Sequence, residues 1–110
     1  MPERRRFARY TVQCPIVAHK DGVMIGDGLS YDLSAGGCAV ESAAPVGRGD
    51  YVALHLYLPD HRDPTTPLQV ELAAVRWTIQ GKFGVEFITM SSEDQQRLRR
   101  YVETFPPGNP

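Results

Sequence analysis

Two short stretches of this chain carry the side chains best suited to binding chemistry. The first is basic, because Arg4, Arg5, Arg6 and Arg9 place four guanidinium groups within six positions. A guanidinium is planar, pairs with phosphate through two parallel hydrogen bonds and stacks on aromatic rings. This stretch therefore predicts an arm that binds anions.

The second stretch is a polar turn expected between two apolar segments, from Asp32 to Gly37. The Asp32 carboxylate can accept hydrogen bonds from the ring and amino hydrogens of a guanine, and the Ser34 hydroxyl both donates and accepts. Gly36 and Gly37 are expected to supply either positive φ or a backbone without a side chain near a ligand. With the basic arm, this turn predicts a ligand that carries phosphate and purine, although Asp32 could instead cap its own turn.

The distribution of charge favours a small anion over a nucleic acid as the ligand. The net charge is −1, but residues 1–10 carry +3 and residues 11–110 carry −4. Nucleic-acid-binding proteins usually spread basic residues along one face, because affinity comes from many phosphate contacts. We therefore expect no nucleic-acid partner. Taken alone, the basic arm is equally consistent with a solvated segment that binds nothing.

The sequence contains no recognisable catalytic or metal-binding constellation. His19, His55 and His61 are scattered, and neither Cys14 nor Cys38 is spaced as a zinc ligand. No nucleophile is linked by a motif to a base. We therefore expect a protein that is not an enzyme, has no cofactor and keeps both cysteines as reduced thiols in its core.

Length and hydropathy predict one domain in a cytoplasmic protein. The 110 residues suffice for a single modest core. No segment approaches the ~20 apolar residues of a membrane-spanning helix, and no apolar segment follows the arginines to make a secretory signal. We divide the chain into a ligand-binding arm at residues 1–10, a barrel with its helix at 11–105 and a short tail at 106–110.

Alternating apolar residues predict a chain made mostly of strands. The expected strands cover residues 11–19, 23–31, 38–42, 50–58, 68–79 and 83–90. Pro15 lacks the amide hydrogen that a central strand needs, which implies an edge or a bulge. The inward face of the fifth strand changes parity near Ala73 and Ala74, so we expect a bulge there. Residues 59–67 are expected to form an exposed loop.

A helix is expected to follow the last strand. Ser91 is suited to be its N-cap, and Leu98, Tyr101, Val102 and Phe105 form one apolar stripe. Six strand candidates with no helix between them predict a mainly β fold. We expect a six-stranded antiparallel β-barrel with the C-terminal α-helix covering one end.

The order and spacing of the two motifs resemble a known family, the PilZ domains, which are bacterial receptors for cyclic di-GMP. These domains carry paired RRxxxR and (D/N)xSxxG motifs. The matching residues here are Arg4, Arg5, Arg9, Asp32, Ser34 and Gly37. The similarity extends over residues 3–102, through a Val-x-Trp at 75–77 and a Gly-Val-x-Phe at 84–87.

The resemblance implies a receptor for cyclic di-GMP that passes the signal to a partner protein controlling motility, pili or exopolysaccharide. It implies that the six matching residues bind the ligand, and Arg6, Gly36 and Trp77 are further candidates. A PilZ adaptor that binds a partner protein without any nucleotide is the alternative.

Trp77 and the surplus arginines lead to two finer expectations. A strand tryptophan usually packs in a core, but Trp77 follows the expected bulge, so we place it at the barrel rim near the ligand. Arg4 and Arg6 supply more positive charge than two phosphates require, and arginine combines charge with a flat face. We therefore predict that cyclic di-GMP binds as an intercalated dimer, with Arg4 on the second molecule.

Overall fold

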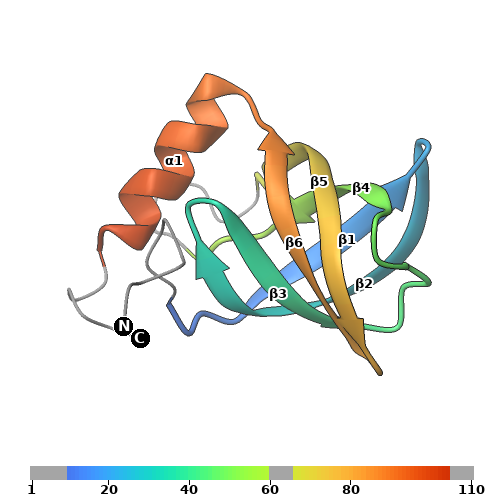
Figure 1. Ribbon diagram of the computed structural model, residues 1–110. Coiled ribbons are helices and arrows are strands. Elements are labelled where there is room, and N and C mark those ends of the chain that lie inside the picture. The colour runs from blue at the N-terminus through green and yellow to red at the C-terminus, as the bar shows by residue number, and fades with distance from the viewer. Residues whose placement is uncertain (1–9, 60–65, 105–110) are drawn as a thin grey trace, which may run out of the picture.

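The computed structural model describes residues 10–59 and 66–104. Six antiparallel strands close into a barrel in the order β1-β2-β3-β6-β5-β4, and a helix covers one end (Figure 1). The elements are β1 (Cys14–Lys20), β2 (Val23–Ser34), β3 (Gly37–Ser42), β4 (Tyr51–Leu56), β5 (Leu68–Ile79), β6 (Lys82–Thr89) and α1 (Ser92–Val102). The predicted fold class is confirmed.

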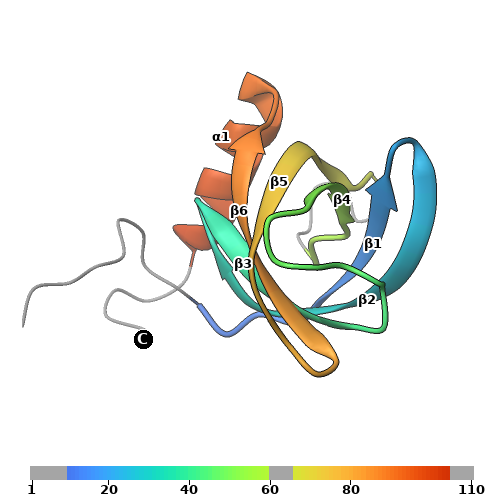
Figure 2. The ribbon, with the colours of Figure 1, turned by 45° about the vertical axis from the view of Figure 1, so that its right-hand side comes forward.

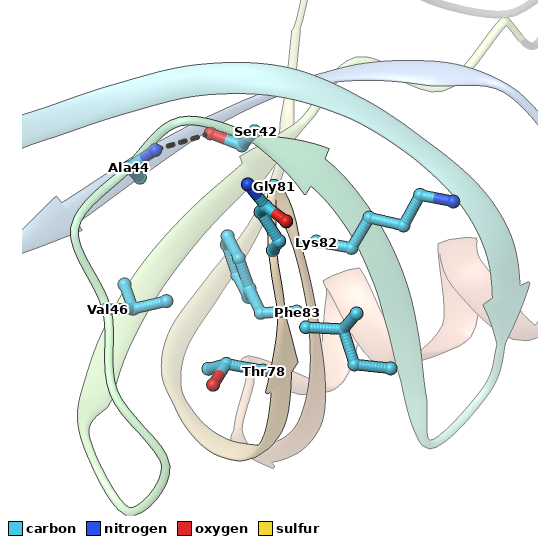
Figure 3. Close-up of a pocket in the computed structure, with 9 residues that line it drawn as sticks. Ser42, Ala44, Val46, Thr78, Gly81, Lys82 and Phe83 are labelled. Atoms are coloured by element: carbon cyan, nitrogen blue, oxygen red, sulfur yellow. Dashed lines mark hydrogen bonds between the residues drawn. The ribbon is translucent and has the colours of Figure 1, made fainter.

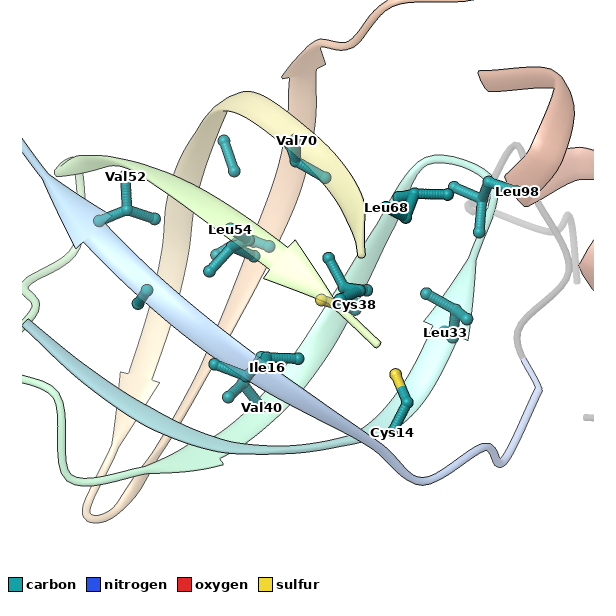
Figure 4. Packing of buried hydrophobic residues seen from close by; sticks show 14 of the residues in the cluster. Cys14, Ile16, Leu33, Cys38, Val40, Val52, Leu54, Leu68, Val70 and Leu98 are labelled. Atoms are coloured by element: carbon teal, nitrogen blue, oxygen red, sulfur yellow. The ribbon is translucent and has the colours of Figure 1, made fainter. Parts of the chain in front are cut away.

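Alternating side chains from all six strands fill the barrel interior (Figure 4). Val52, Leu54 and Leu56 of β4 are at most 2% exposed, as the alternation in the sequence predicts. Burying one such side chain contributes about 1.5–3 kcal/mol. Cys14 and Cys38 lie in the same core, which confirms their expected burial. Burial raises the pKa of the Cys14 thiol to about 11, so the thiol stays protonated at neutral pH.

Tight turns that contain glycine join neighbouring strands. Asp21 and Gly22 connect β1 to β2 with φ of 53° and 78°. Positive φ at both central residues is the geometry whose twist matches a two-residue hairpin. Gly81 has φ of 77° in the connection between β5 and β6. After β3 ends at Ser42, the connection to β4 crosses an opening of the barrel, as Figure 2 shows.

Two bulges interrupt β5. One lies opposite β4, where Leu54 pairs with Val70 and Val52 pairs with Ala73, which confirms the bulge predicted from the change of parity. The other lies between Val75 and Trp77 and was not predicted. It adds a residue to β5 opposite β6, so Trp77 pairs with Gly84. Val75 still faces the interior, where it is 1% exposed.

The second strand extends farther than the sequence predicted. We expected it to end at Tyr31, with a turn from Asp32 onward, but β2 continues to Ser34. Asp32 and Ser34 are therefore strand residues, and the turn itself is short. Close approach of β2 and β3 requires a glycine at position 28, because a Cβ there would collide with the carbonyl of Glu41. The other predicted strand boundaries differ from the observed ones by up to three residues.

The helix begins at its predicted cap and packs on the barrel end. The Ser91 hydroxyl accepts a hydrogen bond from the Asp94 amide at 3.1 Å. Leu98 and Val102 are buried, and Leu98 lies near Leu68 and Leu33 in Figure 4. This confirms the predicted apolar stripe as far as residue 104, the last that the structure describes in this region.

Within the described ranges, 10–59 and 66–104, no helix has the length and apolar character needed to cross a bilayer. The predicted loop at 59–67 falls largely outside those ranges, as do most of the predicted arm and the tail.

Candidate ligand-binding site

The residue that follows the arginine motif is paired directly with the second motif. Tyr10 donates its amide hydrogen to the carbonyl of Leu33, and Leu33 donates to the carbonyl of Tyr10, both at 2.9 Å. Leu33 lies between Asp32 and Ser34, and Arg9 immediately precedes Tyr10 in the chain. The backbone therefore enters the barrel beside the second motif.

The Ser34 hydroxyl organises the turn between β2 and β3. It accepts hydrogen bonds from the amides of Gly36 and Gly37 at 3.2 and 3.1 Å, and it donates to the Gly37 carbonyl at 3.2 Å. Ser34 is only 7% exposed. The hydroxyl thus fixes the backbone on which the motif depends, while its contact with a guanine stays a prediction.

Close packing against β6 explains the glycine at position 37. A Cβ there would collide with the Val85 carbonyl. The carbonyl of Gly36 accepts a hydrogen bond from the Phe87 amide at 2.9 Å, which also ties the turn to β6. Neither Gly36 nor Gly37 is among the described glycines with positive φ. Of the two roles expected for these glycines, positive φ is therefore wrong, and the missing side chain is what Gly37 provides.

Asp32 lies on the outer wall of the barrel, just after a bulge. The register of β2 against β3 shifts between Ser30 and Asp32. Ser30 is fully buried, and its hydroxyl donates to the Asp32 carbonyl at 3.3 Å. Leu33 faces the interior, so the neighbouring Asp32 side chain faces outward. The residue is half-buried, and its Oδ1 atom is shielded from solvent. The strand therefore holds this carboxylate in place.

Asp32 and Trp77 belong to one transverse row across four strands. The register pairs Asp32 with Ala39, Ala39 with Gly84, and Gly84 with Trp77. Paired residues in an antiparallel sheet face the same side. The row spans three strand spacings, roughly 14 Å. The two middle residues, Ala39 and Gly84, are small, so the surface between the carboxylate and the indole is low, and we call it the floor.

The indole of Trp77 packs directly over this floor. A Cβ at Gly84 would collide with Nε1 and Cε2 of Trp77. Trp77 is half-buried and lies outside the core cluster formed by the described residues. The tryptophan thus belongs to the outer wall and not to the interior. Its contact with a ligand stays a prediction.

Two contacts beside this row were missed by the sequence reasoning. The Lys82 ammonium lies 5.4 Å from the centre of the Tyr31 ring, an attraction between cation and ring face. Arg76 donates from Nε and Nη2 to Oε1 of Glu86 at 2.8 and 2.6 Å. Tyr31 precedes Asp32 in the sequence, and Arg76 precedes Trp77. This adjacency to predicted site residues was the only signal in the sequence for either contact.

A separate cavity of about 230 Å³ opens at the far end of β3 (Figure 3). Its lining includes Val46, Phe83 and Lys82. The Ser42 hydroxyl accepts from the Ala44 amide at 3.0 Å and thereby shapes the cavity wall. No predicted site residue lines this cavity, so it is not the site that the motifs indicate.

The arginines of the first motif fall outside the described residues, and their contact with a ligand stays a prediction. These are Arg4, Arg5, Arg6 and Arg9. Among the residues that the structure does describe, no cluster of three or more His, Cys, Asp or Glu side chains is arranged to hold a metal ion.

Solved structures of similar proteins share the fold. MotI/DgrA, the inhibitor of motility from Bacillus subtilis, is 27% identical with a TM-score of 0.75, covering 94% of this chain and 51% of MotI/DgrA. This chain thus spans about half of that protein. The PilZ domain of CeSA from a cellulose synthesizing bacterium is 21% identical with a TM-score of 0.67, covering 88% and 96% of the two chains.

A third solved structure is the PilZ domain of YcgR from Escherichia coli with c-di-GMP. It is 19% identical with a TM-score of 0.63, and the match covers 93% of this chain and 91% of that one. No curated protein matches the sequence significantly. The family model described as PilZ domain matches residues 3–104. Because this match spans nearly the whole chain, the protein belongs to the PilZ domain family.

Proposed function

We propose that this protein is a receptor for cyclic di-GMP that passes the signal to a partner protein. The observation that carries the proposal is the backbone pairing of Tyr10 with Leu33. This pairing places Tyr10, which follows the arginine motif in the sequence, beside Asp32 and Ser34. We therefore expect both motifs to contact one ligand. Family membership and the likeness to a PilZ domain solved with c-di-GMP support the choice of ligand.

Each side chain has a role that its chemistry suits. Arg5 and Arg9 bind the phosphates and the Hoogsteen edges of the guanines, which present two acceptors to a guanidinium fork. Asp32 accepts hydrogen bonds from the Watson–Crick edge of a guanine, which presents donors. Trp77 offers its exposed face to a base, because every base can stack on an aromatic ring.

The surplus of arginines favours two ligand molecules per chain. An intercalated dimer of cyclic di-GMP brings four phosphates together, and Arg4 and Arg6 add cations with flat faces. We expect Arg4 to contact the second molecule. A change from two bound molecules to one in Arg4→Ala supports this role, whereas one molecule per wild-type chain contradicts it.

The downstream partner is proposed to be a protein of a motility, pilus or exopolysaccharide system. Two of the similar structures support this choice, since one is an inhibitor of motility and another comes from a cellulose synthesizing bacterium. The function is therefore that of a non-enzymatic adaptor. The alternative is an adaptor of the same family that binds its partner without nucleotide.

Titration calorimetry with cyclic di-GMP tests the proposal. We expect saturable binding to the wild type, and little heat with cyclic di-AMP, which has the same phosphates but lacks the guanine edge. Arg48→Ala serves as the control variant, because Arg48 is exposed on the connection to β4, away from the β2–β3 turn, and it should bind like the wild type. Absence of binding to either nucleotide would contradict the receptor function and favour the adaptor alternative.

A further inference from the structure

Two histidines meet on the outer wall of the barrel, away from the β2–β3 turn. The ring centres of His19 on β1 and His55 on β4 are 4.8 Å apart, and the ring planes are tilted by 46°. The Nδ1 atom of His19 is buried and has no hydrogen-bond partner in the part of the chain that the structure describes. Buried polar atoms nearly always have a partner, so this nitrogen requires an explanation.

A methionine lies on the same wall, on the strand at the other side of His19. The register pairs Met24 of β2 with His19, and His19 with Ala53 of β4. His55 is two residues from Ala53 and therefore faces the same side. Met24 is 55% exposed although it is a large apolar residue. The register between β1 and β2 shifts here, because Ala18 pairs with Gly26 and His19 with Met24, which leaves Ile25 as an extra residue on β2.

The distance between the rings suits a shared ion. A metal–imidazole bond is about 2.0–2.1 Å long, which places an ion roughly 3 Å from each ring centre. Two centres 4.8 Å apart then subtend an angle of roughly 100° at the ion. This angle lies between those of square and tetrahedral coordination. An ion between the rings would also use the unpaired Nδ1 lone pair of His19.

The donor atoms determine which ion fits. Lys20, which follows His19 in the chain, pairs with Asp50 at 3.3 Å, and the Asp50 carboxylate also accepts from the Gly47 amide at 2.8 Å. The Asp50 carboxylate therefore already has two partners within the protein. The Met24 thioether is a soft ligand, and imidazole is a ligand of intermediate softness that also binds copper, so this set favours copper(I) over magnesium or calcium.

We propose that His19, His55 and Met24 form a binding site for a soft monovalent cation, copper(I), on the outer wall of β2, β1 and β4. Each of three adjacent strands contributes one ligand. The site is open to solvent on the side of Met24, so the ion enters without unfolding the barrel. It shares no residue with the proposed nucleotide site.

Silver(I), a redox-inert probe of copper(I) sites, tests the proposal by calorimetry and NMR in chloride-free buffer. We expect one silver ion per chain, with shifts of the His19 and His55 ring signals and of the Met24 methyl signal. His55→Ala should abolish this binding, and Met24→Leu, which keeps size and removes sulfur, should weaken it roughly tenfold. His61→Ala is the matched control, since His61 is the remaining histidine, and should bind like the wild type.

Three results would overturn the assignment. Binding that persists in His55→Ala would place silver on another group, such as the thiol of Cys14 or Cys38. Unchanged affinity in Met24→Leu, or zinc binding tighter than silver binding, would exclude a soft site that includes the thioether. Since Met24 is exposed, its replacement leaves the fold intact and keeps the test valid even if a histidine variant unfolds.

Discussion

The interior of the barrel and the outer wall beside the β2–β3 turn are made from the same strands, yet they depend on different features of the sequence. The interior requires only apolar side chains at alternate positions, and many residues share its energy. The outer wall brings Asp32 and Trp77 into one row through two bulges and three strand pairings. Substitutions in the interior should therefore change stability, whereas those on the wall should change ligand binding.

Leu54→Ala tests the interior side of this comparison and should have the largest effect. Leu54 is 0% exposed, so the change removes buried area and leaves a cavity. We expect a loss of about 2–5 kcal/mol in the free energy of unfolding, measured by urea denaturation. The affinity of the folded fraction for cyclic di-GMP should stay the same. A loss below about 1 kcal/mol would show that the interior is not closely packed.

Gly37→Ala should affect both regions, because the turn connects them. The new Cβ collides with the Val85 carbonyl, a backbone atom, so β3 and β6 must move apart at a cost of about 1–3 kcal/mol. We expect weaker binding of cyclic di-GMP as well, because movement of the β2–β3 turn would displace Asp32.

Gly47→Ala is the matched control for Gly37→Ala. The nearest atom to its new Cβ would be Oδ2 of Asp50 at 3.8 Å, an ordinary contact. Denaturation and calorimetry should show a near-wild-type protein. Equal effects of the two substitutions would contradict the specific role of Gly37.

Asp32→Ala should separate binding from stability. Removal of a carboxylate that accepts hydrogen bonds from a guanine should weaken binding by about 1.5–3 kcal/mol, measured by calorimetry. The free energy of unfolding should change less, by about 1 kcal/mol or less, because the side chain is half-buried and faces away from the barrel interior. Large destabilisation with unchanged affinity would instead assign Asp32 a structural role in its own turn.

Trp77 gives the smallest expected effect and a direct optical signal. Stacking of a base on the indole contributes about 1–3 kcal/mol, and we expect the lower part of this range because the indole already packs on Gly84. Cyclic di-GMP should quench or shift the fluorescence of this single tryptophan. An unchanged spectrum at saturation would remove Trp77 from the ligand site.

The features that sequence predicts well here are local ones. Alternation across Val52, Leu54 and Leu56 reports burial because successive strand residues face opposite sides. The change of parity near Ala73 reveals a bulge for the same reason. Ser91 identifies the start of the helix, because its hydroxyl can accept from an amide in the first turn.

The arrangement of the site could not be predicted in the same way. The row from Asp32 to Trp77 depends on how β2, β3, β6 and β5 pair, and pairing between distant segments leaves no periodic signal in either one. The bulge before Asp32 is equally silent in sequence. The polar residues from Asp32 to Gly37 were typical of a turn, which led to the wrong prediction that β2 ends at Tyr31. The bridge from Tyr10 to Leu33 is a backbone contact, which side-chain patterns do not report.

A double-mutant cycle between Arg9 and Asp32, followed by titration with cyclic di-GMP, tests most directly whether the two motifs form one site. Arg9→Ala alone should weaken binding by about 2 kcal/mol or more, because a charge-assisted contact with two hydrogen bonds is lost. If both residues hold the same ligand molecule, the loss in the double variant should differ from the sum of the single losses by about 0.5 kcal/mol or more. Strictly additive losses, or unchanged affinity in Arg9→Ala, would contradict the account.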